Sequence, residues 1–224
     1  MNVAVLTLTR DRLPYTQHCF QTLRDKAGCE FDWFVLDQGS TDDTPGWLLD
    51  QDDITTTLLD ENIGICRGLN LLLAESCDPA DYDVLVRFDN DCEVLTPDTL
   101  RIACEAAADH QAIVAPRVLG LNNPPPTVCT LQLDNERWLD VTQILGGIFM
   151  CIPAQVFTSG FRYDERFPAW TGDEAVVPWW QARGGLAGYL HGIEVNHYLT
   201  TEGQKQSDPG YFKRKDREYL EAAG

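Results

Sequence analysis

Acidic residues recur in this sequence where apolar, strand-like runs end. Asp37 follows the run 31–36, and Asp89-Asn90-Asp91 follows the run 82–88. A carboxylate at a strand terminus can accept a hydrogen bond from a nucleoside base or ribose. Two carboxylates that flank one residue offer hard oxygen ligands to a divalent cation. Each pattern taken alone also fits a surface turn that is rich in Asp. The predicted strands and helices around these residues distinguish a binding site from such a turn.

The first half of the chain alternates strands and helices, which would bring these carboxylates to one edge of a sheet. Strands are predicted at 3–8, 31–36, 54–59, 82–88 and 113–115, with helices over 15–26, from 44, over 65–76 and from 96 to 110. Strands separated by helices of this length imply right-handed crossovers and a mostly parallel sheet. Ligands of such sheets bind at the carboxyl ends of the strands.

The second half has a different pattern. A turn-rich break at 122–126 precedes a strand over 128–133, a hairpin turn at 134–135 and a strand over 144–150. Pro153 opens a helical turn, a helix is predicted over 173–183, and His197 ends an apolar strand. These later pieces have too little core to fold alone, so the break is predicted to be a loop within one domain.

Composition excludes several classes of protein. The 224 residues are 44% apolar, which is ordinary for a globular core, and 35 acidic against 17 basic residues give a net charge of −18. Such a charge argues against broad nucleic-acid binding and against anionic membranes. No apolar run is long enough to span a membrane, and the eight cysteines are scattered without a CxxC spacing. We therefore expect a soluble, cytoplasmic protein with reduced cysteines.

Four blocks in order resemble the inverting family 2 glycosyltransferases, and the likeness runs from Val3 to about Tyr198. Residues 5–10 resemble the opening strand of that family, 35–44 the nucleotide-binding turn, 62–64 with Asn70 the third block, and 89–91 the DXD metal motif. The resemblance implies an α/β protein of the GT-A fold, with a mostly parallel central sheet, flanking helices and a small antiparallel portion.

The resemblance also implies roles for single residues. Asp91 would bind Mn²⁺ or Mg²⁺, and His197 is either a third metal ligand or a structural histidine. Arg67 lies two residues before the position where the family often has an arginine, so it either contacts the donor or forms a surface salt bridge. The implied donor contacts are Thr9, Arg10, Asp37, Gly39, Asn62, Arg67, Asp89, Asn90 and Gly147.

An acidic helix start in the second half resembles the segment that supplies the family's catalytic base. Asp173 matches the base position best, and Glu174 is its rival because Gly172 stands where an acidic residue often precedes the base. Inversion needs a carboxylate to accept the proton of the acceptor hydroxyl. Trp170 and Trp179 are predicted acceptor contacts because sugar rings stack on indoles, although core packing is the alternative for such residues.

The resemblance implies a catalytic domain at 1–202, and a compositional break sets off a basic tail at 203–224. This tail is either a mobile lid over the donor diphosphate or a frayed amphipathic end helix. The nucleotide-binding half would span about 1–115 and the acceptor half about 116–202. The implied reaction is metal-dependent transfer of a sugar from a nucleotide-diphosphate donor, most often UDP in this family, to a hydroxyl acceptor.

Two other classes of protein compete with this interpretation. A nucleotidyltransferase that makes nucleotide sugars would normally carry a glycine-rich phosphate loop, whereas residues 9–14 contain no glycine. A binding module that keeps the nucleotide pocket without turnover is the non-enzymatic alternative. The acceptor is open: a glycan, a modified nucleotide or a protein fits, and a hydroxylated nucleic-acid base is a less favoured special case.

Overall fold

The computed structural model describes residues 1–119, 121, 124–167, 172 and 174–198. The predicted tail at 203–224 and the predicted residues Trp170 and Asp173 lie outside this part of the chain. The described elements are β1 (Val3–Thr9), α1 (Leu13–Lys26), β2 (Asp32–Gln38), α2 (Thr44–Leu49), β3 (Ile54–Leu59), α3 (Ile65–Glu75), the short 3-10 helix η1 (Pro79–Asp81), β4 (Val84–Phe88), β5 (Cys92–Val94), α4 (Thr99–His110), β6 (Ala112–Leu119), β7 (Cys129–Gln132), β8 (Trp138–Val141), β9 (Phe149–Pro153), α5 (Ala154–Thr158), α6 (Val176–Gln181) and β10 (Leu186–His197).

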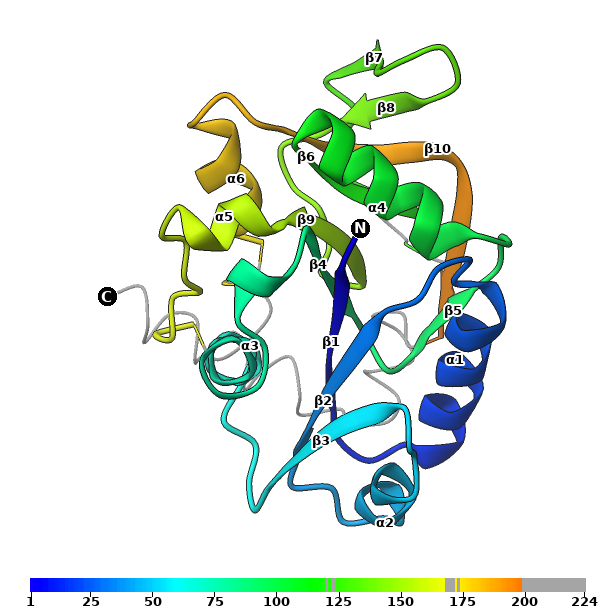
Figure 1. Ribbon diagram of the computed structural model, residues 1–224, viewed down its shortest axis with the longest axis vertical. Coiled ribbons are helices and arrows are strands. Elements are labelled where there is room, and N and C mark those ends of the chain that lie inside the picture. Colours follow the sequence, from blue (N-terminus) through cyan, green and yellow to red (C-terminus); the bar gives the residue numbers. More distant parts are fainter. Residues whose placement is uncertain (120, 122–123, 168–171, 173, 199–224) are drawn as a thin grey trace.

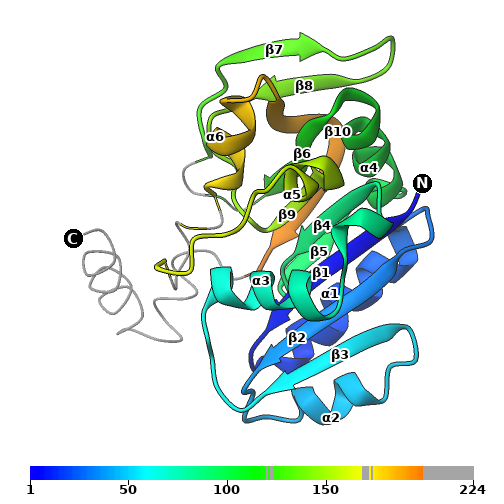
Figure 2. The ribbon, with the colours of Figure 1, turned by 60° about the vertical axis from the view of Figure 1, so that its left-hand side comes forward.

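These strands form one mixed sheet in the order β3-β2-β1-β4-β9-β6-β10-β8-β7, with β5 paired to β10. The four strands from β3 to β4 are parallel to one another, and β10 is parallel to β6. The strand β9 runs antiparallel between β4 and β6. Figure 2 shows the sheet from its β3 end to the antiparallel hairpin β7–β8 at the opposite end. The predicted α/β class and parallel core are confirmed.

Helices cover both faces of the sheet (Figure 1). On one face, side chains of α1, α2 and α4 such as Phe20, Leu48 and Leu100 pack against the sheet. On the other face, α3, α5 and α6 contribute residues such as Leu69 and Phe157. Alternate residues of a strand point to opposite faces, so the run Val84–Phe88 is buried throughout because both faces are covered.

Three local predictions of the second half need correction. The strand predicted over 144–150 begins only at Phe149, because Gly147 and Ile148 form a turn ahead of it. The helix predicted over 173–183 is the shorter α6, which places Pro178 in the first turn, where its missing N–H breaks no hydrogen bond. The strand that ends at His197 is longer than the sequence pattern indicated and begins at Leu186.

The length of β10 depends on a glycine whose role only the tertiary structure reveals. A Cβ atom at Gly188 would lie 2.3 Å from the carbonyl oxygen of Asp140 in the neighbouring strand β8. The glycine therefore permits close backbone approach inside the sheet instead of breaking the strand. The short strand β5, which the sequence pattern did not predict, pairs with the last residues of β10 and so places His197 opposite Cys92.

Candidate active site

The carboxyl ends of β1, β2 and β4 meet the end of β10 at one edge of the sheet. Three predicted residues converge there: one ligand atom from each of Asp89, Asp91 and His197 lies within 4.8 Å of the others. The Nε2 atom of His197 lies 3.2 Å from Oδ1 of Asp91. Both of these side chains are largely buried, with 6% of the Asp91 side chain and 11% of the His197 side chain exposed.

The electrostatics of this cluster suit a cation. Burial, with the charge of Asp91, raises the pKa of the Asp89 carboxyl. Burial opposes protonation of His197, but its hydrogen bond to Asp91 and the two carboxylate charges raise the pKa of the imidazole overall. The two neighbouring carboxylates repel each other, and a positive charge beside them relieves that repulsion. The buried Nδ1 atom of His197 has no hydrogen-bond partner among the described residues, which fits an imidazole available to a ligand.

Asn90, between the two acidic residues, ties this cluster to the start of the chain. Its side-chain amide donates to Thr9 Oγ1 at 3.1 Å and to Thr16 Oγ1 at 2.9 Å. Thr9 is buried at the end of β1, and Thr16 lies in the first turn of α1. The motif at 89–91 is therefore fixed to both β1 and α1, which explains why a polar Asn stands between two acidic residues.

Asp37 lies at the end of β2 with 1% of its surface exposed. Its carboxylate accepts a hydrogen bond from the backbone N–H of Ser40 at 2.9 Å and a second one from the Ser40 hydroxyl. Gly39 between them has φ +71°, and a Cβ atom there would lie 2.7 Å from the carbonyl oxygen of Asp60. The turn after β2 thus requires glycine both for its conformation and for its contact with the next loop.

The Gly39→Ala protein is expected to be less stable than the Gly184→Ala protein by about 1–3 kcal/mol, the usual cost of overpacking. Both glycines have positive φ, +71° and +86°, so both changes strain the backbone, but nothing lies within 4 Å of a Cβ atom at Gly184. Urea unfolding of the two variants measures the difference. Equal free energies of unfolding would show that the loop at Asp60 shifts to accept the added methyl group without loss of stability.

Glu174 is half-buried and lies just before α6. Burial raises the pKa of its carboxyl, and the positive charge of Arg87 opposes that rise. The Nη2 atom of Arg87 also donates to Asp89 Oδ1 at 3.3 Å. The buried positive charge of Arg87 therefore acts on both Asp89 and Glu174. Asp173, the other predicted base, lies outside the described residues.

The remaining predicted residues differ in their surroundings. Arg10 and Arg67 are exposed, the latter on the first turn of α3, and Gly147 is buried. The exposed Asn62 accepts a hydrogen bond from the Gly64 N–H at 2.8 Å and shapes the loop before α3. The Trp179 ring meets Phe161 edge-on at 5.4 Å between centroids, and the Arg183 guanidinium lies 3.6 Å above it. Trp179 packs against these neighbours but is only partly buried, so part of its surface stays accessible.

Two arginines at this edge were not singled out from the sequence. Arg87 interrupts the apolar run 84–88, and a charge inside a buried strand is a signal that could have been noticed. Arg12 lies 3.6 Å from Asp91, measured from Nη1 to Oδ2, whereas the sequence pattern favoured Arg10. Nothing in the local pattern separates Arg12 from Arg10, because only the turn geometry decides which side chain faces Asp91.

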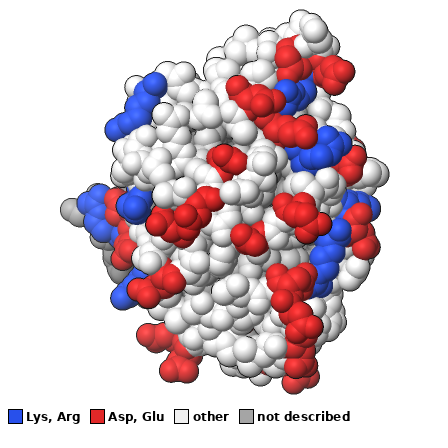
Figure 3. Space-filling view, in the orientation of Figure 1, with Lys and Arg blue, Asp and Glu red and all other residues white. Residues whose placement is uncertain are grey.

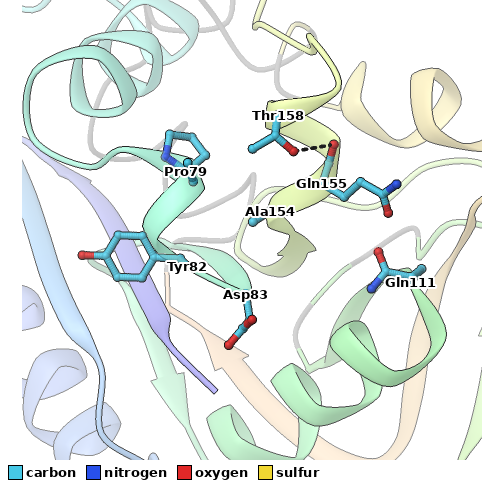
Figure 4. A pocket seen from close by; sticks show the side chains of 8 residues that line it. Pro79, Tyr82, Asp83, Gln111, Ala154, Gln155 and Thr158 are labelled. Carbon is cyan, nitrogen blue, oxygen red and sulfur yellow. Dashed lines mark hydrogen bonds between the residues drawn. The ribbon is translucent and has the colours of Figure 1, made fainter.

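A separate cavity of about 340 Å³ lies at the opposite end of β4 (Figure 4). Asp83, Gln111 and Gln155 line it from three different segments, and no predicted site residue is among its lining residues.

The molecular surface also shows the charge imbalance of the sequence, with acidic groups spread widely over the face in Figure 3 and basic groups in smaller numbers. The converging carboxylates at the other end of the sheet remain the candidate active site.

Comparison with protein families identifies the chain. The family model described as glycosyl transferase family 2 matches residues 4–144. This chain belongs to that family. The matched region contains Asp37, Asp89 and Asp91, so the family assignment covers the acidic residues at the strand ends. No curated protein sequence matches the chain.

Solved glycosyltransferase structures share the fold. GalNAc-T7 with UDP, GalNAc and Mn²⁺ superposes with a TM-score of 0.68 at 13% identity, covering 91% of this chain and 45% of that one. S. aureus TarS 1-349 with UDP-GlcNAc superposes with a TM-score of 0.65 at 16% identity, covering 99% of this chain and 66% of that one. The mannosyltransferase PcManGT from Pyrobaculum calidifontis with GDP-Man and Mn²⁺ superposes with a TM-score of 0.65 at 16% identity, covering 92% of this chain and 59% of that one.

These comparisons confirm the GT-A fold predicted for this family 2 member. The chain spans about half to two thirds of the length of these neighbours. Within the described residues, no helix combines the length and the apolar character needed to cross a lipid bilayer.

Proposed function

We propose that this family 2 member is a metal-dependent, inverting glycosyltransferase that moves a sugar from a nucleotide-diphosphate donor to a hydroxyl acceptor. The observation that carries the proposal is the convergence of Asp89, Asp91 and His197 beside the ends of β1 and β2. UDP is the favoured nucleotide. In support, two of the neighbouring structures hold UDP or UDP-GlcNAc, although a third holds GDP-Man.

The donor end of the site is formed by the parallel strands. Asp37 and Thr9 contact the nucleoside, with the Asp37 carboxylate oriented by the hydrogen bonds that it accepts from Ser40. Asp91 and His197 would hold Mn²⁺ or Mg²⁺, and Asp89 lies close enough to take part or to contact the ribose. A bound divalent cation neutralises the charge that develops on the departing diphosphate. This contribution matters in a chain of net charge −18.

The acceptor end supplies the base. A carboxylate at 173–174 takes the proton of the acceptor hydroxyl while that oxygen attacks the anomeric carbon from the face opposite the diphosphate. The new C–O bond forms as the bond to the diphosphate breaks, so the anomeric configuration inverts. Asp173 is the better match to the family's base position, and Glu174, whose carboxyl pKa is raised by burial, is the alternative. Trp170 and Trp179 remain the proposed acceptor contacts.

Nucleotide binding tests the proposal directly. Titration calorimetry with UDP and GDP in Mn²⁺ should give binding that disappears with EDTA, and the nucleotide sugar of the better nucleotide should be hydrolysed slowly. Failure to bind any nucleotide in Mn²⁺ would overturn the proposal. Binding without any hydrolysis would instead identify the chain as a module that holds nucleotide sugars without turnover.

A further inference from the structure

Arg12 stands at a position that local physical chemistry disfavours for arginine. It is the N-cap residue of α1, where Ser, Thr, Asp and Asn are preferred, and its side chain makes no capping hydrogen bond. Its backbone is left-handed, with φ 67° and ψ 37°, a conformation that is strained for a side chain with a Cβ atom. A positive charge is also unfavourable at a helix N-terminus. Some interaction beyond the helix must offset these three effects.

The turn that carries Arg12 is held in this strained shape by the loop after β2. Asp11 is left-handed as well, with φ 56°. Its N–H donates to Ser40 Oγ and its carboxylate accepts from the Thr41 N–H, both at 2.6 Å, while the Leu13 N–H donates to Asp42 at 3.1 Å. These contacts fix the backbone on both sides of Arg12. Strain held in place by tertiary contacts is typical of functional sites.

The contact that Arg12 makes is with the predicted metal ligand. Its Nη1 atom lies 3.6 Å from Oδ2 of Asp91, while Oδ1 of the same carboxylate lies 3.2 Å from His197. Both carboxylate oxygens of Asp91 thus have a nitrogen neighbour, one from Arg12 and one from His197. A divalent cation would have to replace one of these contacts to bind the carboxylate. The Arg12 side chain is 36% exposed, compared with 8% for Arg87. Of these two arginines, Arg12 is therefore the one whose side chain is free enough to move from Asp91 to another group.

We propose that Arg12 neutralises Asp91 while the site holds no cation and turns to the donor's diphosphate when a divalent cation takes that carboxylate. The inference rests on the proposed function, because it assigns Arg12 a ligand of that same site. A guanidinium matches phosphate oxygens with two parallel hydrogen bonds, so the released side chain is suited to the donor. Arg12 and the cation then compete for Asp91 but cooperate in holding the diphosphate.

The test measures two affinities of the Arg12→Gln protein. Mn²⁺ affinity without nucleotide, followed by the electron paramagnetic resonance signal of free Mn²⁺, should increase by about 2–5-fold, since a partly exposed competitor is lost. UDP affinity at saturating Mn²⁺, measured by calorimetry, should fall by about tenfold or more, as for a lost hydrogen bond to a charged group. Arg12→Lys should keep part of the UDP affinity.

Arg101→Gln is the matched control. Its side chain is 38% exposed and pairs with Asp98 and Glu105, so the variant removes the same charge at the same exposure away from Asp91. The control should move both affinities by less than twofold. The opposite signs of the two effects separate this role from a structural one, because a damaged site would bind both ligands more weakly.

Three results would overturn the inference. They are unchanged affinities in Arg12→Gln, a weakening of both affinities, and a control that behaves as Arg12→Gln does. These results differ from failure of the proposed function, in which the unaltered protein itself would bind no nucleotide in Mn²⁺. In that case the diphosphate role of Arg12 fails too, while the Mn²⁺ titration still decides whether Arg12 competes for Asp91.

Discussion

The Asp173→Asn protein is expected to lose about 10²–10⁴-fold in turnover, the range for removal of a general base, while it still binds UDP and Mn²⁺. The amide cannot accept the proton of the attacking hydroxyl at neutral pH. Hydrolysis of the best nucleotide sugar, in which water replaces the acceptor, measures turnover before the acceptor is known. Calorimetry with UDP measures donor binding.

Glu174→Gln is the paired variant for this prediction, and we expect it to lose less than tenfold. The reverse result, a large loss in Glu174→Gln and a small one in Asp173→Asn, would assign the base to Glu174. A modest loss in both variants would contradict a carboxylate base in this segment. Both amides are close in size to the acids that they replace, so folding is expected to be preserved.

The pH dependence of kcat/KM provides a second readout. A base acts when deprotonated, so the rate is fully present above its pKa and falls as the pH drops through it. Burial raises the pKa of the Glu174 carboxyl, and Arg87 only partly opposes this. If Glu174 is the base, the acidic limb should therefore lie above about 4.3, the ordinary value for glutamate. A limb at or below that value would argue against Glu174.

The Asp91→Asn protein is expected to lose Mn²⁺ affinity by about 100-fold or more. Changes in residues that only support metal ligands already cost about 10–100-fold, and this change removes the charge of a proposed ligand itself. Binding of UDP should fall with it, because the cation that Asp91 would hold would supply the positive charge that attracts the diphosphate. EDTA should have the same effect on the unaltered protein, and added Mn²⁺ should reverse it.

The chain offers a matched control for this change. Asp140 also pairs with an imidazole, that of His191, at 3.0 Å between Oδ2 and Nε2. These two side chains are 33% and 49% exposed, and they lie towards the β7 end of the sheet. Asp140→Asn should leave Mn²⁺ and UDP binding within twofold of the unaltered protein. Intact UDP binding in Asp91→Asn would contradict the metal role of Asp91, since the proposed function routes donor binding through that carboxylate.

Local sequence signals are sufficient for the first half of the fold. The strand predicted at 54–59 has the bounds of β3, and the helix predicted over 65–76 differs from α3 by one residue. Alternating strands and helices leave few topologies, because parallel crossovers are right-handed. The local pattern alone therefore predicts that the acidic residues at the ends of β2 and β4 lie at one edge of the sheet.

The second half is less predictable because its strands pair with distant partners. Gly188 and Gly192 interrupt the apolar pattern of β10. The strands β6 and β8 pair with β10 on either side of Gly188, whereas Gly192 lies in an irregularity between Leu190 and Glu194, where the register with β6 shifts. The three-residue β5 has too few residues to show a period. Strand propensity depends on neighbours across the sheet, so such elements cannot be read from a local window.

The sequence by itself determined the family, the fold class and the identity of the acidic residues at the strand ends. The tertiary structure decided which side chains meet them. His197 reaches Asp91 only because β5 pairs with the end of β10. Arg12 instead of Arg10 contacts Asp91 because the loop after β2 holds Asp11 and Arg12 left-handed. The succession of strands and helices in the first half follows from local patterns, whereas side-chain direction at a strained turn is set by contacts from distant segments.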